Sequence, residues 1–215
     1  MTHPIWPLFD LSVRTPLIEL RYVDDELGVE LANLAARGIH DPSFMPFAFE
    51  WTDAPTEQLL SNTLQHFWKC RSETSPTHWH LNFAVIAAGV VVGSTSLGAD
   101  HFPDLRTFES GSWLGIAHQG KGLGKELRRA TLHLGFAGLG ARRATTSAFS
   151  DNAPSLGVTR SLGYEPNGDL IKLRRGRAAT TLMFALDADD WDARLRSDDI
   201  TIDGLDPCLP FLGCV

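Results

Sequence analysis

Three closely spaced glycines, Gly120, Gly122 and Gly124, constrain this chain more than any other feature of its sequence. They follow an apolar stretch through Ile116 that favours a β-strand. After them, apolar residues recur at helical spacing as far as Ala137. A strand that passes through a glycine turn into a helix presents the first free N–H groups of that helix, and the positive end of its dipole, to the turn. The sequence therefore predicts an anion site, and a phosphate is the favoured ligand.

Two common phosphate-binding patterns do not fit this turn. Gly115 and Gly120-Lys121 have the spacing of a nucleotide-binding P-loop, but Gly122 stands where that loop needs Ser or Thr to bind magnesium. The glycine spacing also departs from the GxGxxG fingerprint of dinucleotide-binding proteins. Lys121 and Lys125 add positive charge beside the turn. The pattern favours a phosphate-bearing ligand other than a magnesium nucleotide.

Composition limits the class of protein. The 215 residues are 43% hydrophobic and 21% charged, which suits one domain over residues 1–215 with a substantial core. A net charge of −7 disfavours broad nucleic-acid binding and suits an amine-bearing partner. We expect Cys70, Cys208 and Cys214 to be reduced thiols of a cytoplasmic protein, because their number is odd and they lack metal-ligand spacing. The N-terminus lacks a signal-peptide pattern, and no apolar run approaches a membrane span.

The order of the predicted elements indicates a mixed α/β chain. Hydrophobic periodicity and turn signals predict strands, helices and one loop over these ranges: a strand after Pro16 to 21, helices 24–38 and 55–71, strands 79–87 and 90–97, a loop 100–105, a strand 106–117, a helix 122–139, a strand 142–149, a helix 154–162, strands 164–173 and 178–186, and a short helix from 189. We expect the tail, residues 187–215, to pack on the body or on a second subunit, so a homo-oligomer is compatible with the sequence.

The segment Phe44–Trp51 carries five large apolar side chains, which is too many for an ordinary solvent loop. Two interpretations remain open at this point. The side chains pack under the core, or some of them line a pocket for an acceptor substrate, because loops often carry binding residues.

Two motifs in the second half of the chain carry a family resemblance. Gln119-x-x-Gly122-x-Gly124 resembles the acyl-CoA pyrophosphate loop of the GCN5-related N-acetyltransferases, the GNAT superfamily. Asn152-x-x-Ser155, followed by Leu162-Gly163-Tyr164, is similar to the second signature of the same superfamily. Two motifs in register are far more specific than either alone.

The resemblance spans residues 14–186 and includes features of one branch. Arg14-Thr-Pro-Leu-x-x-Leu-Arg21 and Trp113-Leu114-Gly115 are similar to the RimJ/RimL-like branch, which acetylates N-terminal amines of ribosomal proteins. The resemblance implies the GNAT fold, an α/β (α+β) architecture. Its mixed, mostly antiparallel central sheet has about seven strands, with a splay after the fourth strand, and about four helices flank it.

The resemblance also implies which residues bind the acyl-CoA. Backbone groups of the strand end would bond the pantetheine arm, the amides of the glycine turn would hold the pyrophosphate, and Asn152 would act from the far side of the splay. Asn152 also suits a helix N-cap before Pro154, and both roles are compatible. The implied cofactor-binding set is Leu114, Gly115, Ile116, Gln119, Gly120, Lys121, Gly122, Leu123, Gly124, Lys125, Asn152 and Ser155.

The chemistry of acyl transfer to an amine suggests catalytic candidates. The amine must lose a proton, and a carboxylate acting through water suffices as base. Glu109, on the strand that leads to the acyl group, is the first candidate, although a solvent-facing strand Glu needs no function; Glu50 and Asp100 are weaker candidates. Many GNAT enzymes protonate the leaving thiolate with a Tyr at the position of Thr159, so Ser155 becomes the expected donor.

The histidine pattern predicts no further site. His118 is expected to be a solvated loop residue. His78, His80 and His101 lack convincing metal-ligand spacing, so no metal is expected.

These observations lead to an acyl-CoA-dependent N-acyltransferase that acts by direct transfer in a ternary complex. The donor is acetyl-CoA or another acyl-CoA such as succinyl-CoA, and the favoured acceptor is a protein or peptide N-terminus. Two alternatives remain open. One is acetylation of a small-molecule amine such as an aminoglycoside or polyamine, and the other is a non-catalytic acyl-CoA-binding sensor.

Overall fold

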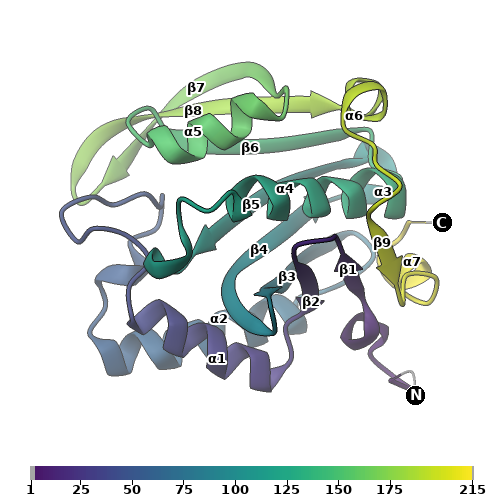
Figure 1. The fold of residues 1–215 in the computed structure, drawn as a ribbon, viewed down its shortest axis with the longest axis horizontal. Coiled ribbons are helices and arrows are strands. Elements are labelled where there is room, and N and C mark those ends of the chain that lie inside the picture. The colour runs from purple at the N-terminus through teal and green to yellow at the C-terminus, as the bar shows by residue number, and fades with distance from the viewer. Residues whose placement is uncertain (1–2, 215) are drawn as a thin grey trace.

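A computed structural model describes residues 3–214 and shows one open sheet of nine strands, in the order β7-β8-β6-β5-β4-β3-β2-β1-β9 (Figure 1). Neighbouring strands are antiparallel except β5 and β6, which run parallel. The strands are β1 (Ser12–Arg14), β2 (Glu19–Tyr22), β3 (His78–Ala87), β4 (Val90–Asp100), β5 (Thr107–Leu114), β6 (Arg143–Phe149), β7 (Glu165–Arg174), β8 (Arg177–Asp187) and β9 (Thr201–Asp203).

Seven α-helices flank the sheet in the described part of the chain. The helix that follows the glycine turn, α4, continues into a π-helical turn at Leu134–Gly138. Asp24 caps α1, as its sequence position predicts, because its carboxylate accepts a hydrogen bond from the amide of Leu27 at 2.8 Å. The helices are α1 (Asp25–Ala36), α2 (Thr56–Ser72), α3 (Phe102–Leu105), α4 (Leu123–His133), α5 (Ala153–Ser161), α6 (Ala188–Arg194) and α7 (Cys208–Phe211).

Alternating side chains of β3 show how the sheet is covered on both faces. Leu81, Phe83 and Val85 are fully buried in the core that also contains residues of α4. Ala84, between them, packs into a separate cluster with α1 and α2. Successive strand side chains point to opposite faces, so α4 covers one face of the sheet and the α1–α2 pair covers the other (Figure 1).

The predicted splay lies between β5 and β6. These strands pair only over Thr107–Glu109 and Arg143–Thr145, although each continues further. The rest of β5 pairs with β4 alone, and the rest of β6 pairs with β8 alone. The GNAT-type fold predicted from the sequence is therefore confirmed, including the splay after the fourth predicted strand.

Nine strands form where about seven were expected. The first predicted strand, which begins after Pro16, corresponds to β2, and β1 is an additional strand before it. Pro16 lies in the turn between them, which the amide of Thr15 closes onto the carbonyl of Ile18 at 2.9 Å. Strand β1 pairs in turn with β9 from the C-terminal tail. The strand predicted to reach Ala117 ends at Leu114, where a 3₁₀ turn over Ile116–His118 begins the approach to the glycines.

The C-terminal tail packs on the body of its own chain. Cys208 and Leu212 are fully buried in the main core. The indole N–H of Trp79 donates to the carbonyl of Leu212 at 3.2 Å. No helix among residues 3–214 is long and apolar enough to cross a membrane.

Candidate functional site

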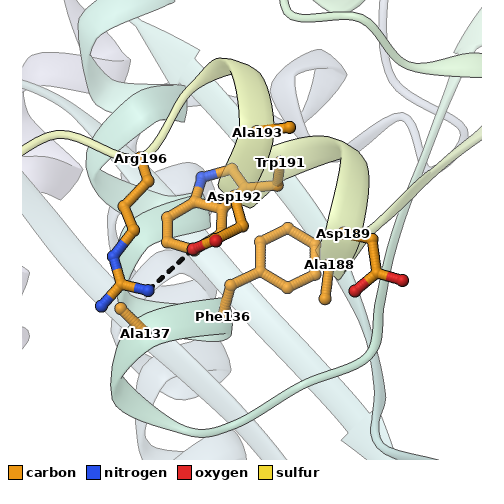
Figure 2. A pocket seen from close by; sticks show the side chains of 8 residues that line it. All are labelled: Phe136, Ala137, Ala188, Asp189, Trp191, Asp192, Ala193 and Arg196. Carbon is orange, nitrogen blue, oxygen red and sulfur yellow. Dashed lines mark hydrogen bonds and ion pairs between the residues drawn. The ribbon is translucent and has the colours of Figure 1, made fainter.

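A cleft of about 1600 Å³ lies where β5 and β6 part. Its walls come from the glycine turn, the start of α5, one side of α2, and strands β3 to β6. The cavity is larger than the roughly 300–1000 Å³ of an ordinary small-molecule site, so it has room for two substrates at once. A smaller hollow between α6 and the π-helical turn, with a volume of about 500 Å³, is lined by Phe136, Trp191 and an Arg196–Asp192 ion pair (Figure 2). None of the predicted site residues lines it.

The glycine turn presents free amides to one end of the cleft. Gly120 and Gly122 adopt φ values of 72° and 79°, which favour glycine, and α4 begins directly after them. The amides of residues 120–122 make no backbone hydrogen bond within the described chain, and those of Leu123 and Gly124 are the first two of the helix. Five consecutive donors at the positive end of a helix can surround a diphosphate.

The ends of the predicted pyrophosphate loop are already bonded. The amide of Gln119 donates to Ile116, and the amide of Lys125 donates to Gly122. The side chain of Gln119 instead holds the turn, because its amide nitrogen donates to the carbonyls of Leu114 and Ile39 at 2.8 and 2.6 Å. The free amides are therefore those of residues 120–124, two fewer than the sequence suggested.

The two lysines beside the turn differ in their contacts. The ammonium of Lys121 donates to the carbonyl of Ala117 at 2.9 Å, across the turn itself. Lys125 lines the cleft and forms no ion pair with another residue of the described range. Lys125 is therefore the cation placed to meet a bound anion.

Only one of the three expected pantetheine-binding positions keeps its amide free. The amide of Gly115 donates to Val92, and that of Ile116 donates to Gly38, each at 3.0 Å. Backbone groups alternate between the two edges of a strand, so Leu114 and Ser112 face the splay. The amides of Gly115 and Ile116 are therefore already bonded within the chain, and a contact of these two residues with pantetheine stays a prediction.

Asn152 and Ser155 lie at the start of α5, on the far side of the splay. The side-chain oxygen of Asn152 accepts from the amide of Ser155 at 3.3 Å, so Asn152 is an N-cap. Both residues are half-buried and line the cleft. Thr159 is 2% exposed and belongs to the core rather than the cleft wall, which leaves Ser155 as the hydroxyl of α5 on that wall.

Glu109 stands where the pairing of β5 with β6 stops. It pairs with Gly98 on one side and with Thr145 on the other, and its exposed side chain lines the cleft. The two weaker carboxylate candidates are already engaged. Glu50 accepts a hydrogen bond from the amide of Arg175, and Asp100 pairs with a ring nitrogen of His78 at 2.5 Å.

The aromatic loop, which we define as residues 39–53, forms a wall of the cleft. Phe47 and Trp51 lie 5.4 Å apart between ring centroids, and Trp51 lies 5.9 Å from Trp113 of β5. All three line the cleft, and so do Phe44 and the 79% exposed Phe49. Met45 is 2% exposed, and Phe47 and Trp51 also pack against a buried cluster of α1 and α2, so the segment both packs on the core and lines the cleft.

The turn between β7 and β8 fastens the aromatic loop. Arg175 donates to both carboxylate oxygens of Asp53, at 2.8 and 2.6 Å, and to the carbonyl of Pro42 at 2.8 Å. These hydrogen bonds hold the pKa of Asp53 below its ordinary value. The neighbouring Arg174 binds both oxygens of Asp151 at 2.7 Å and lowers the pKa of that carboxyl. Figure 1 shows the end of this hairpin beside the loop that follows α1.

Arg128 of α4 is a residue that the sequence reasoning did not select. It is 4% exposed and lines the cleft on the side of α4. Its guanidinium donates to the hydroxyls of Ser110, Thr146 and Ser112 at 3.2, 3.0 and 3.4 Å, and its Nε has no partner in the described chain. No carboxylate among residues 3–214 pairs with it. The signal in the sequence was an arginine next to the buried stripe of α4.

The comparisons with known proteins agree with this geometry. The model of the acetyltransferase (GNAT) domain matches residues 18–165. Among solved structures, RimJ of Mycobacterium smegmatis in complex with CoA-disulfide has a TM-score of 0.70 at 21% identity, over 87% of this chain and 91% of that one. RimL, a ribosomal L7/L12 alpha-N-protein acetyltransferase in complex with coenzyme A, has a TM-score of 0.66 at 17% identity, over 82% and 97%.

A third structure belongs to the same group. A GCN5-related N-acetyltransferase from Brucella melitensis has a TM-score of 0.67 at 22% identity, over 85% of this chain and 80% of that one. At these identities the solved structures establish the fold, whereas the domain model covers well over half of the chain and establishes the family. The chain belongs to the GNAT acetyltransferase family, and is thus an N-acyltransferase that uses an acyl-CoA.

Proposed function

We propose that the protein transfers an acyl group from CoA directly to a primary amine while both substrates occupy the cleft, and that the amine is the N-terminus of a protein or peptide. The observation that carries this proposal is the splay of β5 and β6 beside the five free amides of residues 120–124. The pyrophosphate lies on those amides, and the pantetheine arm follows the free edge of β5 at Ser112 and Leu114. The acyl carbon then lies near the point where the two strands part.

The roles of the side chains follow from that placement. Glu109 stands at the parting point and takes the proton of the amine through water. Ser155 lines the opposite side, and its hydroxyl donates to the departing thiolate. Asn152 fixes the first turn of α5 and so the position of Ser155. The carbonyl carbon gains the amine and loses the thiolate, which leaves as the free thiol of CoA.

An α-amine is the acceptor that this site can use most easily. With a pKa near 7.7–8.0, about 10% of an α-amine is neutral at pH 7, against about 0.04% of a lysine amine with a pKa near 10.4. A single carboxylate base therefore suffices for an α-amine. A lysine amine would be almost wholly protonated, so the same base would find far less neutral amine to react. The open aromatic wall of Phe47, Phe49 and Trp51 suits an apolar or extended peptide segment next to the amine. RimJ- and RimL-type proteins of similar fold support this choice.

Arg128 favours a donor whose acyl group carries a carboxylate, such as succinyl-CoA, over acetyl-CoA. A buried guanidinium that contacts only hydroxyls is costly unless an anion joins it. The fork of a guanidinium matches the two oxygens of a carboxylate. Its Nε is buried without a partner, and its contacts with Ser110 and Ser112 of β5 and Thr146 of β6 put the guanidinium between the two strands that part.

The experiment is a thiol-release assay with the full-length protein. Acetyl-CoA and succinyl-CoA are each combined with peptides that have a free or blocked N-terminus, with a lysine-only peptide, and with an aminoglycoside and a polyamine. We expect release of CoA to depend on a free α-amine and to rise with pH until about pH 8, as the amine becomes neutral. Turnover only with the small amines would overturn the acceptor. Tight CoA binding without release above hydrolysis would support the sensor instead.

A further inference from the structure

Three potential metal ligands meet at the end of the cleft formed by α2 and β3. His66 and Cys70 are one helical turn apart on α2, so both side chains point the same way. His80 comes from β3, against which that face of α2 packs. One donor atom from each residue lies within 4.8 Å of the other two. We propose that His66, Cys70 and His80 bind a divalent transition metal, with Zn²⁺ as the preferred ion.

The distances are close to those of a zinc site. The thiol sulfur of Cys70 lies 3.7 Å from Nε2 of His66. Zinc–sulfur and zinc–nitrogen bonds of about 2.3 and 2.0–2.1 Å put neighbouring ligand atoms about 3.3–3.6 Å apart in a tetrahedron. Small rotations of the His66 and His80 rings, whose centroids are 6.0 Å apart, close the remaining gap. One thiolate with two imidazoles is a donor set that suits zinc.

The three side chains differ in burial. Cys70 is 8% exposed, His80 is half-buried and His66 is exposed. Imidazole nitrogen and thiolate sulfur are donors that zinc prefers, and a bound dication would hold the Cys70 sulfur as a thiolate.

Further contacts place the fourth coordination position toward the cleft. His66 and His80 line the cleft, and Asn82 lies beside His66 and Cys70 as a supporting polar group. Gly98 leaves room for the imidazole ring of His80, because a Cβ at position 98 would lie 3.0 Å from Nδ1 of that ring. Three protein ligands with one open position are typical of zinc sites that bind a further molecule. His80, Gly98 and Glu109 occupy one row across β3, β4 and β5, so the metal would lie on the acceptor side.

The sequence pattern alone does not predict this site. His66-x-x-x-Cys70 is a chelating pair only on a helix, and His80 joins it only through packing of α2 on β3. The other cysteines of the chain, Cys208 and Cys214, lie in the tail and have no histidine in such a cluster within the described residues.

The test is titration of the reduced full-length protein with Co²⁺ and then Zn²⁺. We expect one equivalent of tetrahedral cobalt, seen by its visible bands and by a thiolate-to-cobalt band in the near ultraviolet, and displacement of cobalt by zinc. Cys70→Ser should remove the thiolate band and weaken zinc binding at least about a hundredfold, because the ligand set loses its only anion. His80→Asn should weaken zinc binding at least about tenfold.

Cys214→Ser is the matched control, because it removes a half-buried thiol outside the cluster and should leave both spectra and affinity unchanged. Circular dichroism and CoA titration verify that each variant is folded. If Cys70→Ser does not fold, His80→Asn tests the site instead, because the His80 side chain is only half-buried and its replacement should leave the fold intact. Wild-type protein that fails to take Zn²⁺ from a chelator of micromolar affinity overturns the site, and so does Cys70→Ser with unchanged affinity. Either result leaves CoA binding, and with it the proposed function, untouched.

Discussion

The two halves of the cleft are built in different ways. The proposed donor half consists of backbone groups: the amides of residues 120–124 and the edge of β5 that faces the splay, at Ser112 and the amide of Leu114. The proposed acceptor half consists of side chains from α2, β3 and the aromatic loop, which are far apart in the sequence, and the β7–β8 turn fastens that loop. A backbone surface recognises the part of the substrate that all acyl-CoA molecules share. A wall of side chains can vary without disturbing it.

The difference explains why the family is easy to recognise while the substrate is not. Diphosphate binding requires left-handed glycines at fixed positions before a helix, and Gly120 and Gly122 satisfy that requirement locally. The wall proposed to bind the acceptor is held by contacts such as that of Arg175 with Asp53, which no local pattern reveals. Substitutions should therefore separate the halves. Changes in the glycine turn should abolish donor binding, and changes in the aromatic wall should affect the acceptor alone.

The largest effect should come from Gly122→Glu. A carboxylate at this position meets the diphosphate, and the φ of 79° strains any side chain, so we expect CoA affinity to fall by about a thousandfold or more. Isothermal titration with CoA measures the change. Gly168→Glu is the matched control, because Gly168 has a φ of 96° and open space around it but lies on β7, outside the cleft wall. Equal affinity in the two variants would remove the glycine turn from the donor site.

Ser155→Ala should separate catalysis from binding within the donor half. Loss of the proton donor should lower kcat about ten- to a hundredfold, the low end of acid–base effects. The Kd for CoA should change little, because Asn152 caps the amide of residue 155 whatever side chain it carries. Single-turnover rates and CoA titration give both quantities. Ser161→Ala, whose hydroxyl donates to a helix carbonyl on the exposed side of α5, is a control that should keep full turnover. A Ser155→Ala enzyme as fast as the wild type would exclude this hydroxyl from the reaction.

Arg128→Met should change donor preference rather than donor binding. The variant keeps an unbranched apolar stem and removes the buried charge, so the fold should tolerate it. If the guanidinium binds a distal carboxylate, the ratio of kcat/KM for succinyl-CoA over acetyl-CoA should fall about tenfold, as for the loss of one charged hydrogen bond. Arg129→Met, which removes a neighbouring cation paired with Glu126 outside the cleft wall, should leave the ratio unchanged. An unchanged ratio in Arg128→Met as well would assign the residue to structure alone.

Features that depend on local sequence patterns could be predicted from the sequence, and features that depend on long-range packing could not. The strand–glycine–helix element, the cap by Asp24 and the order of the main elements depend on local patterns, and the structure confirms them. The strand β9 was missed because three residues of a tail become a strand only by pairing with β1. Arg128 was missed because a cation beside an apolar stripe normally reaches solvent, and only the parting of β5 and β6 creates a polar interior for it.

The smallest effect should come from Arg175→Ala, at the fastening of the aromatic loop. The variant loses the hydrogen bonds to Asp53 and Pro42, so residues 39–53 should sample positions in which Trp51 no longer meets Trp113. Because these contacts are half-exposed, we expect only a three- to tenfold rise in the KM for the peptide acceptor, roughly the worth of one or two such bonds. The Kd for CoA should change little, because Gln119 keeps its bond to Leu114 even if Ile39 moves, and the free amides of the glycine turn belong to residues 120–124. Arg177→Ala, in the same hairpin but without these bonds, is the control. A parallel loss of CoA affinity would mean that the two halves of the cleft are coupled after all.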